Sequence, residues 1–87
     1  MATVFIPSQW RDLTAGQAHL DLPGASVGAV LQALVAAYPA IGERLFDDGR
    51  IRPGLAVAVD GEMGSHALRH ALRPNSELSI IPMIAGG

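Results

Sequence analysis

The sequence predicts an α+β fold in which one main helix packs across a mixed sheet of four to five strands. Three observations lead to this prediction. Apolar residues recur at helical spacing in one long segment, two short strand-like stretches precede it, and two apolar stretches bounded by turn residues follow it. The chain has 87 residues, of which 49% are apolar, so it can build one small core and no more than one domain.

The helix is the best-marked element. Ser26 is a favourable N-cap, because its hydroxyl can accept a hydrogen bond from an N–H of the first turn. Apolar residues on one helical face follow it: Val27, Val30, Leu31, Leu34, Val35 and Tyr38. Pro39 ends the helix, since proline has no backbone N–H to continue it. We expect this apolar face to supply much of the core.

The strands are predicted on both sides of this helix. Residues 3–6 are rich in β-formers, and residues 18–22 alternate between apolar and polar. Residues 55–59 form a nearly continuous apolar run closed by the turn at Asp60, and residues 78–81 form the last strand, ended by Pro82. The order strand, strand, helix, strand, strand matches the β-grasp plan, with the first and last strands side by side in the middle.

Three connections complete the prediction. Residues 7–16 are expected to be a plain hairpin connection between the first two strands. Residues 41–49 are expected to contain a short turn or a single helical turn, followed by a polar loop. Residues 66–72 are expected to form a helical turn, and residues 73–77 a turn built on Pro74.

Several classes of chemistry are excluded by composition. The chain has no cysteine and no lysine, so disulfides, thiolate nucleophiles, a Walker A loop and a lysine Schiff base cannot form. A net charge of −2 and six scattered arginines argue against nucleic-acid binding. The longest apolar runs fall well short of a membrane span, and the start lacks the pattern of a secretory signal. We therefore expect a cytoplasmic protein.

Four side-chain or backbone groupings are candidate sites. His66 and His70 are four residues apart, but no cysteine and no carboxylate except Glu62 would complete a metal site, so surface histidines are the preferred interpretation. His19 is interpreted as a lone exposed histidine. We predict no metal site and no stably bound cofactor.

The remaining two groupings are also interpreted as structural. Asp47-Asp48-Gly49 lacks the further oxygen ligands of a calcium loop and is predicted to be a solvated loop. Gly24 and Gly28 bracket the start of the helix, where exposed N–H groups could hold an anion. Without a glycine-rich phosphate motif or a basic neighbour, a simple strand-to-helix turn is preferred.

The C-terminal segment carries the strongest functional signal. Residues 1–82 are predicted to be the β-grasp domain, and residues 83–87 a flexible tail ending in two glycines. Frayed termini are common, yet Met83, Ile84 and Ala85 are apolar, and they lead to Gly86 and Gly87. Glycine has no Cβ and can pass through a narrow channel. An extended tail of about 3.3–3.6 Å per residue is long enough to enter the active site of a partner.

The carboxyl group of Gly87 is the candidate reactive group. A carboxylate is ionised near neutral pH and is a poor electrophile, so it must first be activated, most simply as an acyl-adenylate made from ATP. A nucleophile such as sulfide can then attack the acyl group and give a thiocarboxylate. Because no nucleotide site is recognisable in this chain, the ATP would be used by a partner enzyme.

The sequence resembles the MoaD/ThiS family of ubiquitin-like, β-grasp sulfur carriers. The end "ELSIIPMIAGG" resembles the C-terminal pattern of that family. The stretch "SVGAVLQALVAAYPAIGERLFDDGRIRPGLAVAVDGE" is similar to its helix, its tyrosine–proline stop and its next strand. The resemblance covers essentially the whole chain.

The resemblance implies a carrier, which is a protein co-substrate rather than an enzyme. An E1-like enzyme would adenylate Gly87 and convert it to a thiocarboxylate, and Gly86 would let the end reach into partner sites. Residues 82–85 match the anchoring segment of the family (Pro82, Met83, Ile84 and Ala85). The apolar sheet surface near that end would dock both the activating enzyme and the sulfur-accepting enzyme.

Several pathways and roles stay open. The end "SIIPMIAGG" and the "ERLF" segment favour the carriers of cysteine synthesis, whose acceptor is a cysteine synthase. The small subunit of molybdopterin synthase, which acts with the large subunit, is the near alternative, although its end is usually more aromatic. A ubiquitin-like modifier joined to lysines of targets, and a non-catalytic interaction module with an inert tail, are alternatives of another class.

The chain also departs from the family pattern. Asp60 stands where asparagine is common, and Pro53-Gly54 replaces a bulkier link. The segment "MGSHALRHALRPN" differs from the usual charged loop. These departures bear on the identity of the partners rather than on the chemistry of the tail.

Overall fold

The protein folds around one four-stranded mixed sheet. The computed structural model describes residues 1–63 and 68–82, and all structural statements below concern these residues. The strand order is β2-β1-β6-β5, with the bounds β1 Ala2–Phe5, β2 His19–Leu22, β5 Leu55–Val59 and β6 Glu77–Pro82. Strand β1 pairs in parallel with β6, while the β1–β2 and β5–β6 pairs are antiparallel. The first and last strands therefore lie in the middle, as predicted.

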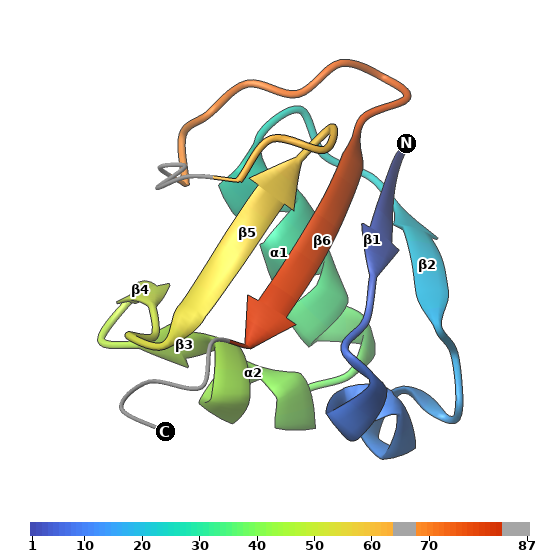
Figure 1. Cartoon of the computed structure of the whole chain (residues 1–87), viewed down its shortest axis with the longest axis vertical. Helices are drawn as coiled ribbons and strands as arrows, with labels where there is room; N and C mark the ends of the chain where they lie inside the picture. The colour runs from blue at the N-terminus through green and yellow to red at the C-terminus, as the bar shows by residue number, and fades with distance from the viewer. Residues whose placement is uncertain (64–67, 83–87) are drawn as a thin grey trace.

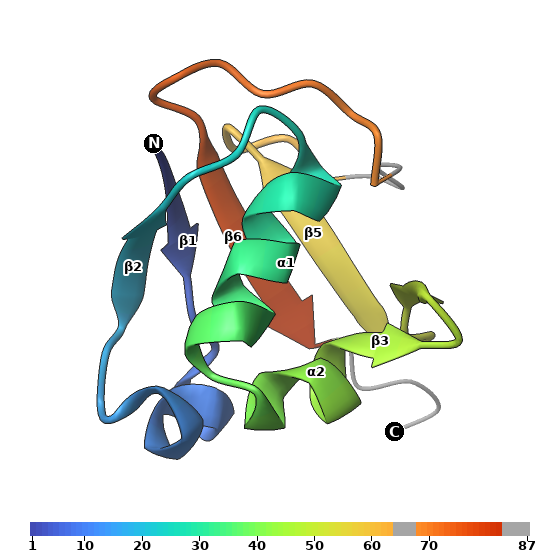
Figure 2. The same ribbon diagram turned by 180° about the vertical axis from the view of Figure 1, so that it is seen from behind.

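Helix α1 (Val27–Ala37) crosses one face of this sheet. It lies behind the strands in Figure 1 and in front of them in Figure 2. The hydroxyl of Ser26 accepts a 3.2 Å hydrogen bond from the N–H of Ala29, which confirms the predicted N-cap. The helix ends before Pro39, also as predicted, and Tyr38 donates its backbone N–H to the carbonyl of Leu34.

The core lies between α1 and the covered face of the sheet. Its fully buried side chains come from α1, β1, β6 and the short helix α2 (Ala40–Leu45): Val4, Val27, Val30, Leu31, Leu34, Ile41, Leu45 and Leu78. Each such side chain contributes about 1.5–3 kcal/mol relative to full exposure. This cluster fixes which face of the sheet is covered and which is open.

The connection between β1 and β2 is more structured than predicted. Residues Ser8–Thr14 form a 3₁₀ helix, η1, where the sequence indicated a plain connection. Trp10 is 4% exposed and belongs to the core. The buried hydroxyl of Thr14 donates to the carbonyl of Gln17 at 2.9 Å, so its polar atom is satisfied. The core contact of Trp10 explains why this segment folds into a compact turn.

The prediction of a polar loop after the short helix is wrong. Residues there form a second, two-stranded sheet, with β3 (Phe46–Asp47) antiparallel to β4 (Arg50–Ile51). Asp48 and Gly49 form its two-residue turn, and both have positive φ, at 55° and 77°. Aspartate and glycine are the residues that such a turn favours.

Candidate functional site

The described site centres on the end of β6, from which the chain enters the predicted tail. Strand β6 ends at Pro82, which pairs in register with Leu55 at the start of β5. In Figure 1 the arrowhead of β6 lies at the same end of the molecule as α2 and β3. Pro82 is half-buried. Of the six predicted site residues, Pro82 alone is described, and Met83, Ile84, Ala85, Gly86 and Gly87 lie outside the described residues.

An open sheet face leads to this point. Side chains at positions paired across a sheet share a face. The burial of Val4 under α1 therefore places its neighbour Phe5 on the other face. The register places Ser79 and Ala58 in one row with Phe5, and Ala56 beside Ile81 in the next row toward Pro82. We call these five residues the open-face patch: Phe5, Ala56, Ala58, Ser79 and Ile81.

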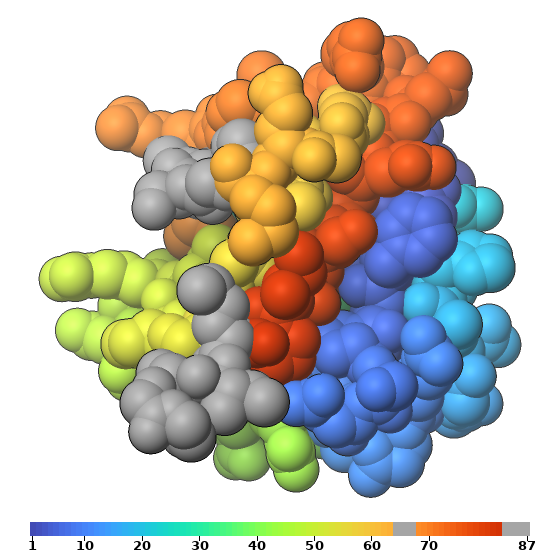
Figure 3. Space-filling model, viewed as in Figure 1, coloured from blue at the N-terminus to red at the C-terminus, as the bar shows by residue number. Residues whose placement is uncertain are grey.

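The open-face patch is largely apolar. Phe5 is 38% exposed, whereas Ala58 is buried, at 5%. Figure 3 shows this side of the molecule, with side chains of β1 (blue), β6 (red) and β5 (yellow) next to one another. The ring of Phe5 lies 6.0 Å from that of His19 on β2, so His19 borders the patch. Sequence reasoning expected an apolar docking surface here but could not name its residues.

The opposite end of the open face is polar. Asp21 and Glu77 flank Thr3 in one row across the sheet, and the Thr3 hydroxyl donates to the Asp21 carboxylate at 2.7 Å. Beyond this row, Asp60 accepts from the backbone N–H of Glu77 at 2.8 Å. Hence the open face is charged at the start of β6 and apolar toward its end at Pro82.

Asp60 has a structural role at this polar end. Its carboxylate also accepts from the Ser76 hydroxyl at 3.1 Å and from the Arg73 guanidinium at 3.2 Å. These hydrogen bonds, led by the one from the Glu77 N–H, hold the pKa of Asp60 below its usual range. Asp60 has φ of 51°, a conformation that asparagine and aspartate tolerate. The departure from the family pattern at Asp60 is therefore accommodated by the loop that precedes β6.

The start of α1 is closed to anions by the protein itself. The N–H of Val27 donates to the carbonyl of His70 at 3.0 Å, and the N–H of Gly28 donates to the carbonyl of Leu68 at 2.7 Å. Gly24 has φ of +144°, and a Cβ there would meet the N atom of Val30 at 2.7 Å. The segment is therefore a simple strand-to-helix turn, which is the interpretation that the sequence favours.

The loop whose carbonyls bind the N–H groups at the start of α1 differs from its prediction. Residues 68–72 form turns and an isolated bridge between Ala71 and Ser26, so the expected helical turn is wrong for this part. His66, which with His70 forms the candidate metal pair, lies outside the described residues. His70 and His19 are both exposed. Within residues 1–63 and 68–82, no group of three or more histidine or carboxylate side chains could hold a metal ion.

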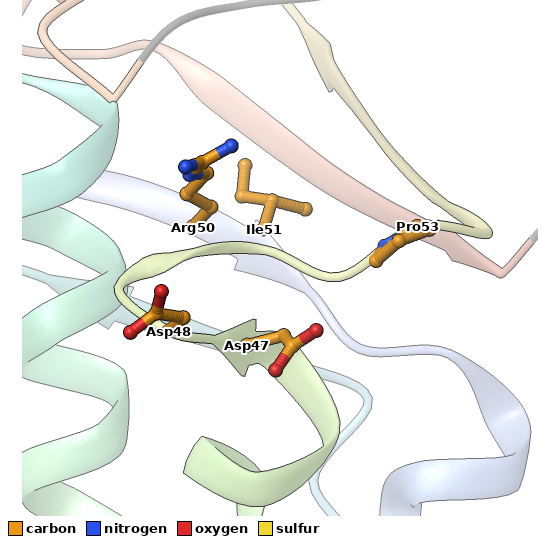
Figure 4. Close-up of a pocket in the computed structure, with 5 residues that line it drawn as sticks. All are labelled: Asp47, Asp48, Arg50, Ile51 and Pro53. Carbon is orange, nitrogen blue, oxygen red and sulfur yellow. The ribbon is translucent and has the colours of Figure 1, made fainter.

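A shallow hollow of about 380 Å³ lies over the β3–β4 hairpin. It is lined by Asp47, Asp48, Arg50, Ile51 and Pro53, which Figure 4 draws around the hairpin turn. Of the two carboxylates of the candidate cation loop, Asp47 thus ends β3, where it pairs with Arg50, and Asp48 lies in the hairpin turn. Their positions are explained by the turn, and we assign no ligand to the hollow.

None of the helices in the described part of the chain is both long and apolar enough to cross a bilayer. The longest of them, α1, has 11 residues, whereas a span needs about 20.

The sheet order, the single helix across one face and the exit from a central strand define a ubiquitin-like β-grasp protein. Solved structures agree with this class. The structure of CysO from Mycobacterium tuberculosis matches with a TM-score of 0.87 and 31% identity, over 97% of this chain and 100% of that one. The Amycolatopsis orientalis BexX/CysO complex contains a chain that matches with a TM-score of 0.89 and 26% identity, over the whole of both chains.

Sequence comparison identifies the family. The model of the ThiS family matches residues 4–87. The sulfur carrier protein CysO of M. tuberculosis is 34% identical over 90 aligned positions, covering 98% of this chain and 97% of that protein. Small archaeal modifier protein 1 of Haloferax volcanii is 40% identical over 71 positions, covering 79% of each. The chain belongs to the ThiS family of ubiquitin-like sulfur carriers.

Proposed function

We propose that this protein carries sulfur as a thiocarboxylate on Gly87 and donates it to a biosynthetic enzyme. A carboxylate oxygen of Gly87 attacks the α-phosphorus of ATP in an E1-like partner, and pyrophosphate leaves. Sulfide then attacks the acyl carbon, and AMP leaves. The product is the thiocarboxylate. The protein is a co-substrate in this scheme, and the use of ATP is our ground for placing it in the cytoplasm.

The observation that carries this proposal is the position of the chain exit. Strand β6 is a central strand, and its last residue, Pro82, lies at the apolar end of the open face. A partner that covers the open-face patch would therefore be adjacent to the point at which the chain leaves β6. In this proposal the patch serves for docking, and the glycine end serves for delivery.

The acceptor that we favour is an enzyme of cysteine synthesis. Support comes from the relatives named CysO, which match over nearly the full chain in sequence and in structure. The thiocarboxylate sulfur would attack the β-carbon of an activated serine derivative, and the group that activates the serine oxygen would leave. Hydrolysis of the bond between this sulfur and the acyl carbon of Gly87 would then release the product and regenerate the carboxylate. The large subunit of molybdopterin synthase is the alternative acceptor.

A second candidate function is supported by the archaeal relative. Small archaeal modifier protein 1 is 40% identical over the part that aligns, and its name describes a protein modifier. In that role the adenylated Gly87 would be attacked by a lysine amine instead of sulfide. The chain contains no lysine, so it could not form side-chain-linked polymers of itself. The two roles share adenylation and differ only in the nucleophile.

The first test is the adenylation step. The activating enzyme of the same host would be incubated with ATP, labelled pyrophosphate and the protein, and the exchange of label into ATP would be measured. We expect exchange with the full chain and none after deletion of Gly86 and Gly87. A variant extended by one residue beyond Gly87 is the matched control and should also be inactive. Equal exchange with all three proteins would contradict the proposal.

A further inference from the structure

Three prolines lie at the same end of the sheet, at or near the ends of three neighbouring strands. Pro7 comes two residues after the end of β1, Pro53 two residues before the start of β5, and Pro82 is the last residue of β6. Proline cannot donate a backbone hydrogen bond, so each removes one possible donor from a strand ladder. Their positions in the register determine which bonds are missing.

On the β1 side, Pro7 removes the next donor of the parallel ladder. Thr3 is paired with Glu77 and donates its N–H to the carbonyl of Ser76 at 3.0 Å. Phe5 and Ser79 form the last pair. Continuing the register by two residues would place Pro7 opposite Ile81, with its N atom facing the carbonyl of Ile80. Pro7 has no hydrogen to give, so the ladder cannot continue from β1.

Pro82 removes the reciprocal donor. In the same register its N atom would face the carbonyl of Pro7. Pro82 has no N–H, and the carbonyl of Pro7 already accepts from the N–H of Trp10 at 2.9 Å, within η1. Hence both bonds that would extend the β1–β6 pair are absent, one on each strand.

On the β5 side, a turn removes the next partner. The pairs Leu55–Pro82 and Ala56–Ile81 are the last of the antiparallel ladder. The next position on β5 is Gly54, which has φ of +91° and lies in a turn in which Leu55 donates to the carbonyl of Arg52 at 3.2 Å. Proline followed by glycine at the two central positions is typical of a type II turn. The positive φ of Gly54 takes the backbone out of the extended conformation that pairing requires.

We propose that Pro7, Pro82 and the Pro53-Gly54 turn are positioning residues that stop strand pairing at the end of β6. Strand pairing is blocked on both sides of β6 at the same level, at Pro82. The functional benefit of this arrangement rests on the proposed function. A tail held in the ladder would have to break those bonds before it entered an active site, and the competent fraction would fall accordingly.

The test restores the two missing donors. The double variant Pro7→Ala/Pro82→Ala provides an N–H opposite the carbonyl of Ile80 and another opposite the carbonyl of residue 7. Pro74→Ala is the matched control, because Pro74 is exposed and lies in the turn before β6, at the other end of that strand. Amide hydrogen exchange of residue 7 would be measured in the double variant, and the rate of sulfur loading by the activating enzyme would be measured for each protein. Exchange of Val4 and Leu78 would verify that the sheet is intact.

We expect the amide of residue 7 in the double variant to exchange about fivefold more slowly than an unbonded amide, the factor given by one backbone hydrogen bond of ordinary net strength. Loading should slow by a similar factor, and Pro74→Ala should behave as wild type. An unprotected amide of residue 7 in a double variant with an intact sheet would overturn the inference, even if loading slowed. Slower exchange with wild-type loading would overturn the positioning role. If wild type itself takes up no sulfur, the proposed function fails, while the exchange data still decide the pairing.

Discussion

Asp60 and Glu77 are joined by two hydrogen bonds. The backbone N–H of Asp60 donates to the carbonyl of Glu77 at 2.8 Å, and the backbone N–H of Glu77 donates to the Asp60 carboxylate, also at 2.8 Å. One residue thus closes the β5–β6 ladder with its main chain and its side chain together. The strand that leads to the tail is fixed at its start by this pair.

Replacement of Asp60 by asparagine should lower the melting temperature moderately. Asparagine keeps the positive φ and can still accept from Glu77, but its NH₂ group cannot accept from the Ser76 hydroxyl or from Arg73. Asp60→Ala should lower it further, because the Glu77 N–H also loses its partner. Arg73→Ala is the control and should change little, since the Arg73 side chain is 79% exposed. Equal melting temperatures for all four proteins in thermal unfolding would refute this role.

The stability that Asp60 confers should depend on pH in one direction. The Glu77 N–H, followed by Arg73 and Ser76, holds the pKa of Asp60 below its usual range. The contribution is therefore present above the pKa that this carboxyl has in the unfolded chain, and it is lost as the pH falls through the folded pKa. Melting temperatures of wild type and Asp60→Asn should differ most near neutral pH and converge in acid. A difference that widens in acid would show that the sign is wrong.

Gly28→Ala should destabilise the protein by about 1–3 kcal/mol. A Cβ at this position would lie 2.9 Å from the carbonyl oxygen of Leu68, which also accepts the N–H of Gly28. The backbone of the loop would have to move. Gly42→Ala is the matched control, because its Cβ would meet only the side chain of Val35, at 3.1 Å. Since alanine favours a helix over glycine by about 1 kcal/mol, Gly42→Ala should be neutral or stabilising in denaturant unfolding.

Phe5→Ala should weaken binding to the activating enzyme more than it weakens the fold. Phe5 is 38% exposed in the open-face patch, and aromatic residues of this kind often carry about 2 kcal/mol or more of binding energy. Gln32→Ala, an exposed change on α1 across the molecule, is the control for binding. Leu34→Ala should show the opposite pattern, with a loss of about 2–5 kcal/mol of stability, because Leu34 is fully buried. Calorimetric titration and denaturant unfolding would measure the two effects, and unchanged affinity of Phe5→Ala would remove the patch from the docking surface.

The sequence was sufficient for the elements with a long or regular pattern. Helix α1 and the strands β1, β2, β5 and β6 were predicted because each carries several apolar residues at one spacing. Strands β3 and β4 were missed because two residues are too few to show a period, although Asp48-Gly49 is a hairpin signal that could have indicated them. The 3₁₀ helix η1 was missed because Trp10 is its only large core residue and one residue sets no pattern.

The candidate site was predicted unevenly for a similar reason. The tail was recognisable because its chemistry is contained in consecutive residues. The open-face patch joins Phe5 with Ala58 and Ser79, and these come together only through the strand register. The N–H groups at the start of α1 are bound by the carbonyls of Leu68 and His70, in a loop about 40 residues later in the sequence. No local sequence pattern indicates such a contact.

The central claim is that Gly87 carries sulfur, and intact-mass spectrometry tests it most directly. The protein would be measured as isolated from its host and again after incubation with the activating enzyme, ATP and sulfide. We predict a mass gain equal to the exchange of one oxygen for sulfur, located at Gly87 by fragmentation and absent when Gly87 is deleted. Adenylation followed by attachment of Gly87 to lysines of other proteins, with no sulfur gained, would contradict the carrier and favour the modifier.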